Sequence, residues 1–210
     1  MASALPAAGK PVLTTGKVGG TAVKAGAKLS ASAEKGTTVT FGIGGGSAAC
    51  ASASFTARVV KNPSAKGRAT LSITSEKISG CPPVTVGGFS ATVSLSAINL
   101  PYDGTISTAK GHPIVIAESG TSKPTGFDAT VDVTGLGSFA CIFTATSASG
   151  HASNKHSTVA FSGQTFTLNK ALTGADFTDC SLAGTSPSFT ATLGPVLDKS
   201  VRHSPRIFVS

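Results

Sequence analysis

The chain has 210 residues, of which 12% are charged and 40% hydrophobic, and its formal net charge is +8. Disordered chains combine few apolar residues with high net charge, so this composition favours an ordered protein. Strong helix formers such as Glu, Gln and Met are scarce, which disfavours a helical fold. No apolar run is long enough to cross a membrane as a helix.

Residues 1–35 form a basic N-terminal segment that we expect to pack onto the first half of the protein. Its lysines are Lys10, Lys17, Lys24, Lys28 and Lys35, and its one acidic residue is Glu34. The wide spacing of the series favours a solubility role, since lysines on edge strands discourage sheet association. The alternative is a basic surface that attracts an anionic partner, which would be an anionic polymer of the cell envelope, nucleic acid or a membrane face. The wide spacing and the lack of Trp argue against nucleic acid as the partner.

Apolar and polar residues alternate in many short segments, which is the pattern of half-buried β-strands. In Phe89–Ala97, Phe89 and every second residue after it form one face, and serine and threonine form the other. The other expected strands are 39–43, 55–59, 69–73, 129–133, 139–143, 165–168 and 189–193, with shorter ones at 22–23, 114–116, 159–161 and 207–209. The core should contain Phe55, Leu71, Phe89, Val93, Leu95, Phe139, Phe143, Phe161, Phe166 and Phe189. We expect less than about a tenth helix.

A short sequence with a cysteine at its end occurs twice, which predicts a tandem duplication. Gly46-Ser-Ala-Ala-Cys50 returns as Gly137-Ser-Phe-Ala-Cys141, and each copy is followed by a second cysteine. The halves would be residues 36–120 and 121–210, each closed by one disulfide, Cys50–Cys81 and Cys141–Cys180. The predicted fold is therefore all-β, an antiparallel sandwich or barrel built from two related halves. The alternative is four free buried thiols in a reducing compartment.

No residue pattern predicts catalysis, a metal or a cofactor. His151 and His156 lie in a polar segment expected to be a surface loop, while His112 and His203 lie elsewhere. Asp176 and Asp179, just before Cys180, are more typical of turns and caps than of a cation site. The serines lack the Gly-x-Ser-x-Gly elbow of hydrolases, although a triad assembled from distant positions is an alternative.

Three short motifs resemble a group of uncharacterised exported actinobacterial proteins rich in β-structure. They are Asn99-Leu-Pro-Tyr102, Cys141-x-Phe143 and Gly194-Pro-Val-Leu-Asp198, and the resemblance covers most of the chain. It implies export and a β-rich fold, and it supplies no catalytic residues. The start, Met1-Ala2-Ser3-Ala4, has no apolar leader region, although Ala2–Ala4 is similar to a signal cleavage site.

These observations favour a non-catalytic secreted scaffold, either a surface or matrix component or a binding module for an extracellular partner. The partner would be an extracellular protein or an anionic envelope polymer. The alternative is a secreted inhibitor or toxin-like binder that acts through an exposed loop, for which residues 99–111 and 150–157 are the candidates.

Overall fold

The computed structural model describes residues 9–43, 46–64, 67–117, 124–182 and 184–210. The elements up to the middle of the chain are β1 (Leu13–Thr15), β2 (Thr21–Ala22), β3 (Lys28–Ser32), β4 (Val39–Ile43), β5 (Gly46–Cys50), β6 (Ser52–Lys61), β7 (Arg68–Ser79), β8 (Val84–Val86), β9 (Phe89–Ala97), β10 (Tyr102–Ser107) and β11 (Pro113–Ala117). The remainder are β12 (Thr125–Val133), β13 (Gly137–Ala145), β14 (Ser147–Ser153), β15 (Thr158–Thr165), β16 (Thr167–Leu168), α1 (Lys170–Thr173), η1 (Gly174–Asp176), α2 (Phe177–Leu182), β17 (Ser188–Leu193), β18 (Leu197–Asp198) and β19 (Ile207–Val209).

The predicted all-β class is confirmed, with 60% strand, 5% helix and antiparallel sheets. Strand β9 shows why the sequence folds this way. Ala91, Val93 and Leu95 are buried, while the hydroxyl residues between them are exposed. Such a strand is stable only when its apolar face is covered by another layer, which the rest of the sheet supplies.

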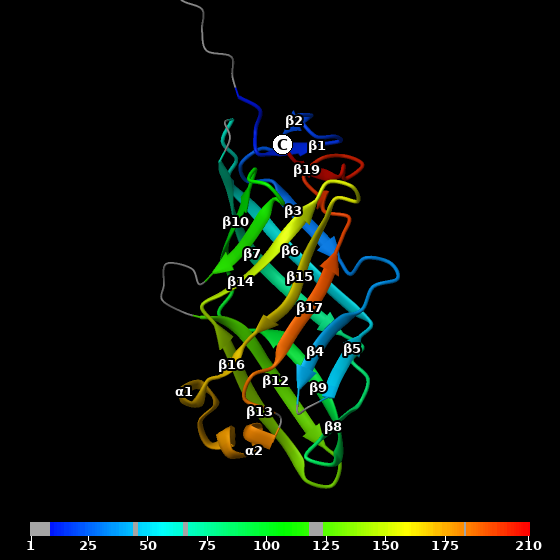
Figure 1. The fold of residues 1–210 in the computed structure, drawn as a ribbon, viewed down its shortest axis with the longest axis vertical. Coiled ribbons are helices and arrows are strands. Elements are labelled where there is room, and N and C mark those ends of the chain that lie inside the picture. The colour runs from blue at the N-terminus through cyan, green and yellow to red at the C-terminus, as the bar shows by residue number, and fades with distance from the viewer. Residues whose placement is uncertain (1–8, 44–45, 65–66, 118–123, 183) are drawn as a thin grey trace, which may run out of the picture.

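One part of the main sheet curls round into a closed ring. Its neighbours run in the order β3, β6, β7, β10, β11, β14, β15 and β17. The ring closes where Ala33, just after β3, bridges to Leu193 of β17. Figure 1 shows these strands inclined around a common axis, with the small sheet of β1, β2 and β19 across one end. Closure leaves this part of the sheet without free edges.

The body continues beyond the ring as two facing layers. On one side lies the hairpin β4–β5, and on the other lie β9, β12 and β13. Aromatic rings fill the space between them: Phe41 of β4 packs edge-to-face against Phe127 of β12 and Phe143 of β13, with ring centroids 5.9 and 6.2 Å apart. The two parts share one continuous hydrophobic core.

Strands from the two expected halves of the chain pair with each other in one sheet. Strand β9 of residues 36–120 pairs with β12 of residues 121–210, and β17 pairs in return with β4. Both predicted disulfides are present: Cys50–Cys81 joins β5 to the segment after β7, and Cys141–Cys180 joins β13 to α2. The duplication itself remains a prediction, drawn from the sequence.

The sequence did not predict the helices, which cover the edge of β13. The backbone N–H of Ala140 donates to Asp176 at 3.0 Å, and that of Ile142 donates to the Thr173 hydroxyl at 3.1 Å. Two side chains thus replace the hydrogen bonds that a neighbouring strand would make at this edge. Asp176 therefore has a structural role, and Asp179 is exposed.

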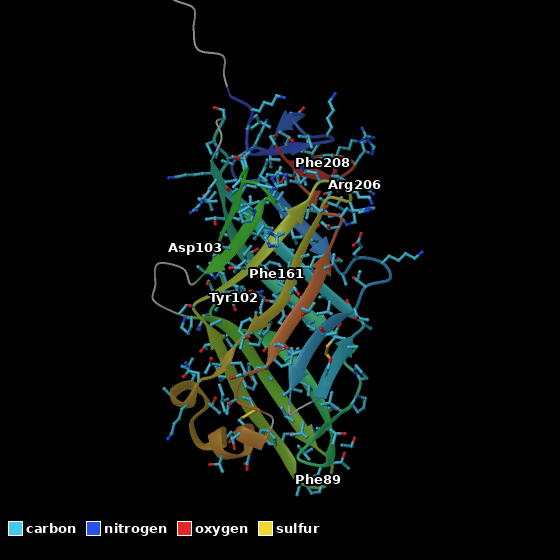
Figure 2. The ribbon with its side chains drawn as sticks, viewed as in Figure 1. Phe89, Tyr102, Asp103, Phe161, Arg206 and Phe208 are labelled. Atoms are coloured by element: carbon cyan, nitrogen blue, oxygen red, sulfur yellow. A yellow bond between two sulfur atoms is a disulfide. The ribbon has the colours of Figure 1, made fainter. Side chains whose placement is uncertain are left out.

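Three other expectations were wrong. Phe89 is 50% exposed, because it starts β9 at the tip of the body (Figure 2), where no layer covers it. Residues 99–111 are not a loop, since they contain β10, which pairs with both β7 and β11. Residues 150–157 are the end of β14 and a tight turn. Of the remaining expected core residues, Phe55, Leu71 and Phe139 are partly buried against the core, and the others are buried.

Candidate functional site

Four of the five predicted lysines lie at one end of the molecule. Lys17 is in the turn between β1 and β2, Lys24 follows β2, and Lys10 precedes β1. Lys28 begins β3, and its carbonyl accepts a hydrogen bond from the backbone N–H of Lys199 at 2.7 Å. All of these lysines are exposed. Lys35 lies apart from them, in the turn between β3 and β4 that is bonded to β17.

Basic residues from two further segments join these lysines. Arg58 of β6 lies directly opposite Lys28, and Arg206 bridges to Leu197 beside the β1–β2–β19 sheet (Figure 2). We define the basic end as Lys10, Lys17, Lys24, Lys28, Arg58, Lys199, Arg202 and Arg206, which are all exposed. The sequence reasoning missed the last four because the fold brings them to this end from distant positions.

Almost no negative charge offsets the basic end. Residues 9–33 and 199–210 contain no Asp or Glu. Asp198 is 2% exposed, and its carboxylate accepts a hydrogen bond from Ser200 N–H at 2.9 Å. Of the exposed acids, Asp179 lies at the opposite end, where it lines an apolar groove with Phe89. The molecule therefore carries its positive charge asymmetrically along its long axis, which gives a directional field.

The histidines do not form a metal site. Within the described residues, no three His, Cys, Asp or Glu side chains are close enough to hold a metal ion. His151 lies in β14 rather than in a surface loop, and it faces Pro113 of β11. The ring of His112 contacts the amide of Asn154 at 3.3 Å, which is a structural role.

A second candidate site, which sequence reasoning missed, lies inside the body at Glu76. The register of the β6–β7 pair shifts twice, at Val60 of β6 and at Thr74 of β7. At the second shift Ala57 pairs with Ile73 while Thr56 pairs with Ser75, so Thr74 has no partner residue in β6. This β-bulge shifts the alternation by one residue. Before it Leu71 and Ile73 face inward, and after it Glu76 and Ile78 do so. The signal in the sequence is the odd spacing from Ile73 to Ile78.

The carboxyl group of Glu76 has a strongly perturbed environment. The residue as a whole is half-buried, but Oε1 is fully enclosed and has no hydrogen-bond partner among the described residues. Burial raises the pKa of Glu76 from its ordinary 4.5 to about 8, since water cannot stabilise the charged form. At neutral pH the group is therefore mostly protonated. Strongly shifted, enclosed groups of this kind cluster at functional sites.

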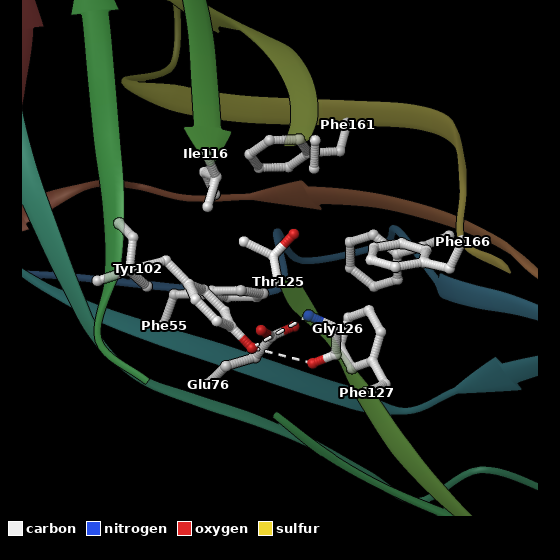
Figure 3. A pocket seen from close by; sticks show the side chains of 12 residues that line it. Phe55, Glu76, Tyr102, Ile116, Thr125, Gly126, Phe127, Phe161 and Phe166 are labelled. Carbon is white, nitrogen blue, oxygen red and sulfur yellow. Dashed lines mark hydrogen bonds between the residues drawn. The ribbon is translucent and has the colours of Figure 1, made fainter. Parts of the chain in front are cut away.

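Tyr102 of β10 lies beside Glu76 and closes one side of the pocket (Figure 3). Its hydroxyl contacts the carbonyl oxygens of Ile98 and Gly126, the second at 2.9 Å, and can donate to either. Burial raises the pKa of Tyr102 to about 12, and the charge of Glu76 adds to the effect. The tyrosine is neutral at physiological pH, and its polar atom is satisfied by the backbone.

The rest of the pocket wall is apolar and aromatic. Phe55 lies opposite Glu76 across the β6–β7 pair. Phe127 packs edge-to-face against Phe166 with the ring centroids 4.9 Å apart. Figure 3 shows these rings grouped around the carboxyl group and the tyrosine hydroxyl.

Comparisons with known protein families, curated proteins and solved structures gave no significant match. Among the described residues, no helix is long and apolar enough to cross a membrane.

Proposed function

We propose that this protein is a non-catalytic binding module of an exported β-scaffold, and that its basic end binds an anionic polymer of the cell envelope. The observation that carries this proposal is the meeting of basic side chains from three separate segments, around residues 10–28, 58 and 199–206, at one end of the body. This gathering of charge at one end favours a binding role over the alternative of a general solubility role.

The chemistry of the basic end suits a flexible polyanion. Its lysines are compact point charges on flexible stems, and they recognise phosphate or sulfate groups without demanding one geometry. The molecule has no Trp and a single Tyr, which is buried at Glu76, so stacking of nucleic-acid bases has no support here.

The two disulfides support the proposal that the protein is exported from the cytosol. Both cysteine pairs are bonded, and structural disulfides persist in oxidising compartments, typically outside the cytosol.

The test is retention on immobilised polyphosphate, with neutral dextran as the blank matrix. The variant K17Q/K24Q removes two charges from the basic end. The matched control K35Q/K77Q removes two charges elsewhere, so both proteins have the same net charge. We expect the wild-type protein and the control to elute at similar salt concentration, and K17Q/K24Q to elute clearly earlier, since screened attraction depends on local charge density. Equal elution of all three, or equal losses in both variants, would reject the basic end as the binding site.

The apolar groove at the opposite end supports a second candidate, contact with an extracellular protein. Phe89 and Leu136 are 50% and 66% exposed beside a groove of about 420 Å³, which Phe139 and Asp179 also line. Exposed apolar side chains around a groove are typical of protein contacts. Capture from culture medium that F89S abolishes and K17Q/K24Q leaves intact would favour this candidate.

A further inference from the structure

We propose that the cavity beside Glu76 binds a small primary alkylammonium ion, with the cation against the Glu76 carboxylate and the alkyl chain in the adjoining apolar cavity. This inference is independent of the basic end, because the cavity lies in the core and uses none of the basic residues.

The cavity beside Glu76 lacks one hydrogen-bond donor among the described residues. Buried polar atoms in folded proteins are almost always paired, and Oε1 of Glu76 is not. The other polar side chains around it are already satisfied: Thr125 donates to the Ala145 carbonyl at 2.9 Å, and the Tyr102 hydroxyl contacts two backbone carbonyls. A ligand with N–H donors would supply what the protein does not.

A β-bulge turns Glu76 into the apolar interior, where its carboxyl group lowers the stability of the fold. Without the bulge at Thr74, the alternation of β7 would place Lys77 rather than Glu76 on the inner face, opposite the aromatic wall. Bulges that re-aim one side chain are common next to binding sites. A carboxyl group held in an apolar wall destabilises the protein, and functional sites are where such a cost is retained.

The cavity beside Glu76 has an aromatic wall, which suits an organic cation. Phe55, Phe127, Phe161 and Phe166 line the cavity together with Tyr102. Aromatic rings attract organic cations through their electron-rich faces, and the attraction is stronger where water is excluded. Aromatic rings combined with one carboxylate recognise an ammonium group, whereas a carboxylic acid or phosphate ligand would find no positive group among the described residues lining the cavity.

The shape of the interior sets the size of the ligand. The cavity at Glu76 measures about 30 Å³, and a second cavity of about 80 Å³ shares Phe55, Ile73, Ile116 and Phe161 with it. The second is lined by aliphatic residues such as Leu29, Leu71 and Val159. Since a water molecule needs about 10–15 Å³ measured in this way, the first cavity holds an ammonium group and the second a chain of roughly three to five carbons.

Binding would be coupled to loss of one proton. The free protein holds Glu76 as the neutral acid below pH 8, whereas the complex pairs R–NH₃⁺ with the carboxylate, so the acid proton passes to solvent. The other titratable group among the described lining residues is Tyr102, which stays neutral, and Lys77 next in the chain is exposed. Affinity should therefore rise about tenfold per pH unit up to about pH 8.

The experiment is calorimetric titration of the whole protein with n-butylammonium chloride at pH 6, 7 and 8. The uncharged n-butanol, of equal length, is the matched ligand, and E76Q is the matched variant. We expect saturable butylammonium binding that strengthens with pH, with release of about one proton at pH 6–7 measured by comparing buffers of different ionisation enthalpy. E76Q should bind butylammonium at least tenfold more weakly and should bind butanol as the wild-type protein does.

A second variant tests the position of the chain. V159L adds bulk to the apolar cavity and leaves Glu76 unchanged, so methylammonium binding should be retained and butylammonium binding weakened several-fold. The proposal is overturned if wild-type protein and E76Q bind butylammonium equally, if butanol binds as tightly as the cation, or if neither binds. Retention on polyphosphate reports separately on the basic end and is expected to be unchanged in E76Q and V159L.

Discussion

The side chain of Asn62 binds the backbone of Leu13 at both its polar atoms. Leu13 N–H donates to Oδ1 at 2.8 Å, and Nδ2 donates back to the Leu13 carbonyl at 2.8 Å. Asn154 holds Val209 in the same way, with distances of 2.8 and 2.7 Å. Leu13 and Val209 are direct partners in the β1–β19 pair, so the β6–β7 and β14–β15 turns hold the β1–β2–β19 sheet in place. Lys17 of the basic end lies in the turn between two strands of this sheet.

The first prediction concerns this support. N62D keeps the size and the acceptor but loses two donated hydrogen bonds, to the carbonyls of Leu13 and Val23. We expect a loss of about 1–3 kcal/mol in the free energy of unfolding. Urea unfolding measures it, and T134A, at an exposed position, is the control that should stay within about 0.5 kcal/mol. Faster amide exchange across residues 13–23 would locate the effect, and equal midpoints for N62D and wild type would contradict it.

The second prediction concerns the pH dependence of stability. The unfolded Glu76 carboxyl ionises near its ordinary pKa of 4.5, whereas the folded group keeps its proton until about pH 8. The unfolded state therefore binds fewer protons between these values, and stability falls as pH rises through this window. The full loss is on the order of 3–5 kcal/mol.

The neutral variant E76Q removes this dependence. Its free energy of unfolding should match that of the wild type at about pH 4 and exceed it clearly at pH 8. Burial also raises the pKa of Asp128, which gives a dependence of the same sign in both proteins, so their difference isolates Glu76. Urea midpoints that shift in parallel with pH in the two proteins would rule out a buried Glu76.

The third prediction concerns the disulfide of the second half. C141S/C180S releases α2 from β13, and the chain-entropy model predicts a loss of about 3–4 kcal/mol. The helical segment should become sensitive to limited proteolysis within residues 170–182, because its covalent link to β13 is lost while the hydrogen bonds of Asp176 and Thr173 to the β13 backbone remain. C50S/C81S should lose similar stability without exposing that segment. Cleavage at the same place in both variants would contradict this separate role.

The sequence predicted the strands and the disulfides because both leave local or repeated signals. Period-two alternation marks β9 from end to end, and the repeated Gly-Ser-x-Ala-Cys pattern pairs the cysteines within each half. The basic end was predicted only in part, since no local pattern places Arg58 or Lys199 beside Lys28. Glu76 was missed because a polar side chain in a strand is ordinarily read as facing solvent, and only the bulge at Thr74 reverses its direction.

The last prediction compares Phe89 and Phe189, which begin the similar alternating sequences Phe89-Ser-Ala-Thr-Val93 and Phe189-Thr-Ala-Thr-Leu193. Phe189 of β17 is 4% exposed and packs against Phe127, with the ring centroids 5.6 Å apart. F189A should therefore lower the free energy of unfolding by about 3–5 kcal/mol, as is usual when a buried aromatic side chain is truncated to alanine. Phe89 is half exposed at the tip of the body, so F89A should cost less than about 1 kcal/mol. Chemical unfolding at pH 6 measures the loss in free energy of unfolding for each variant relative to the wild type. Similar losses would mean that the tip of β9 is covered in solution, for instance by a second molecule, and the dependence of the F89A loss on protein concentration would then identify that contact.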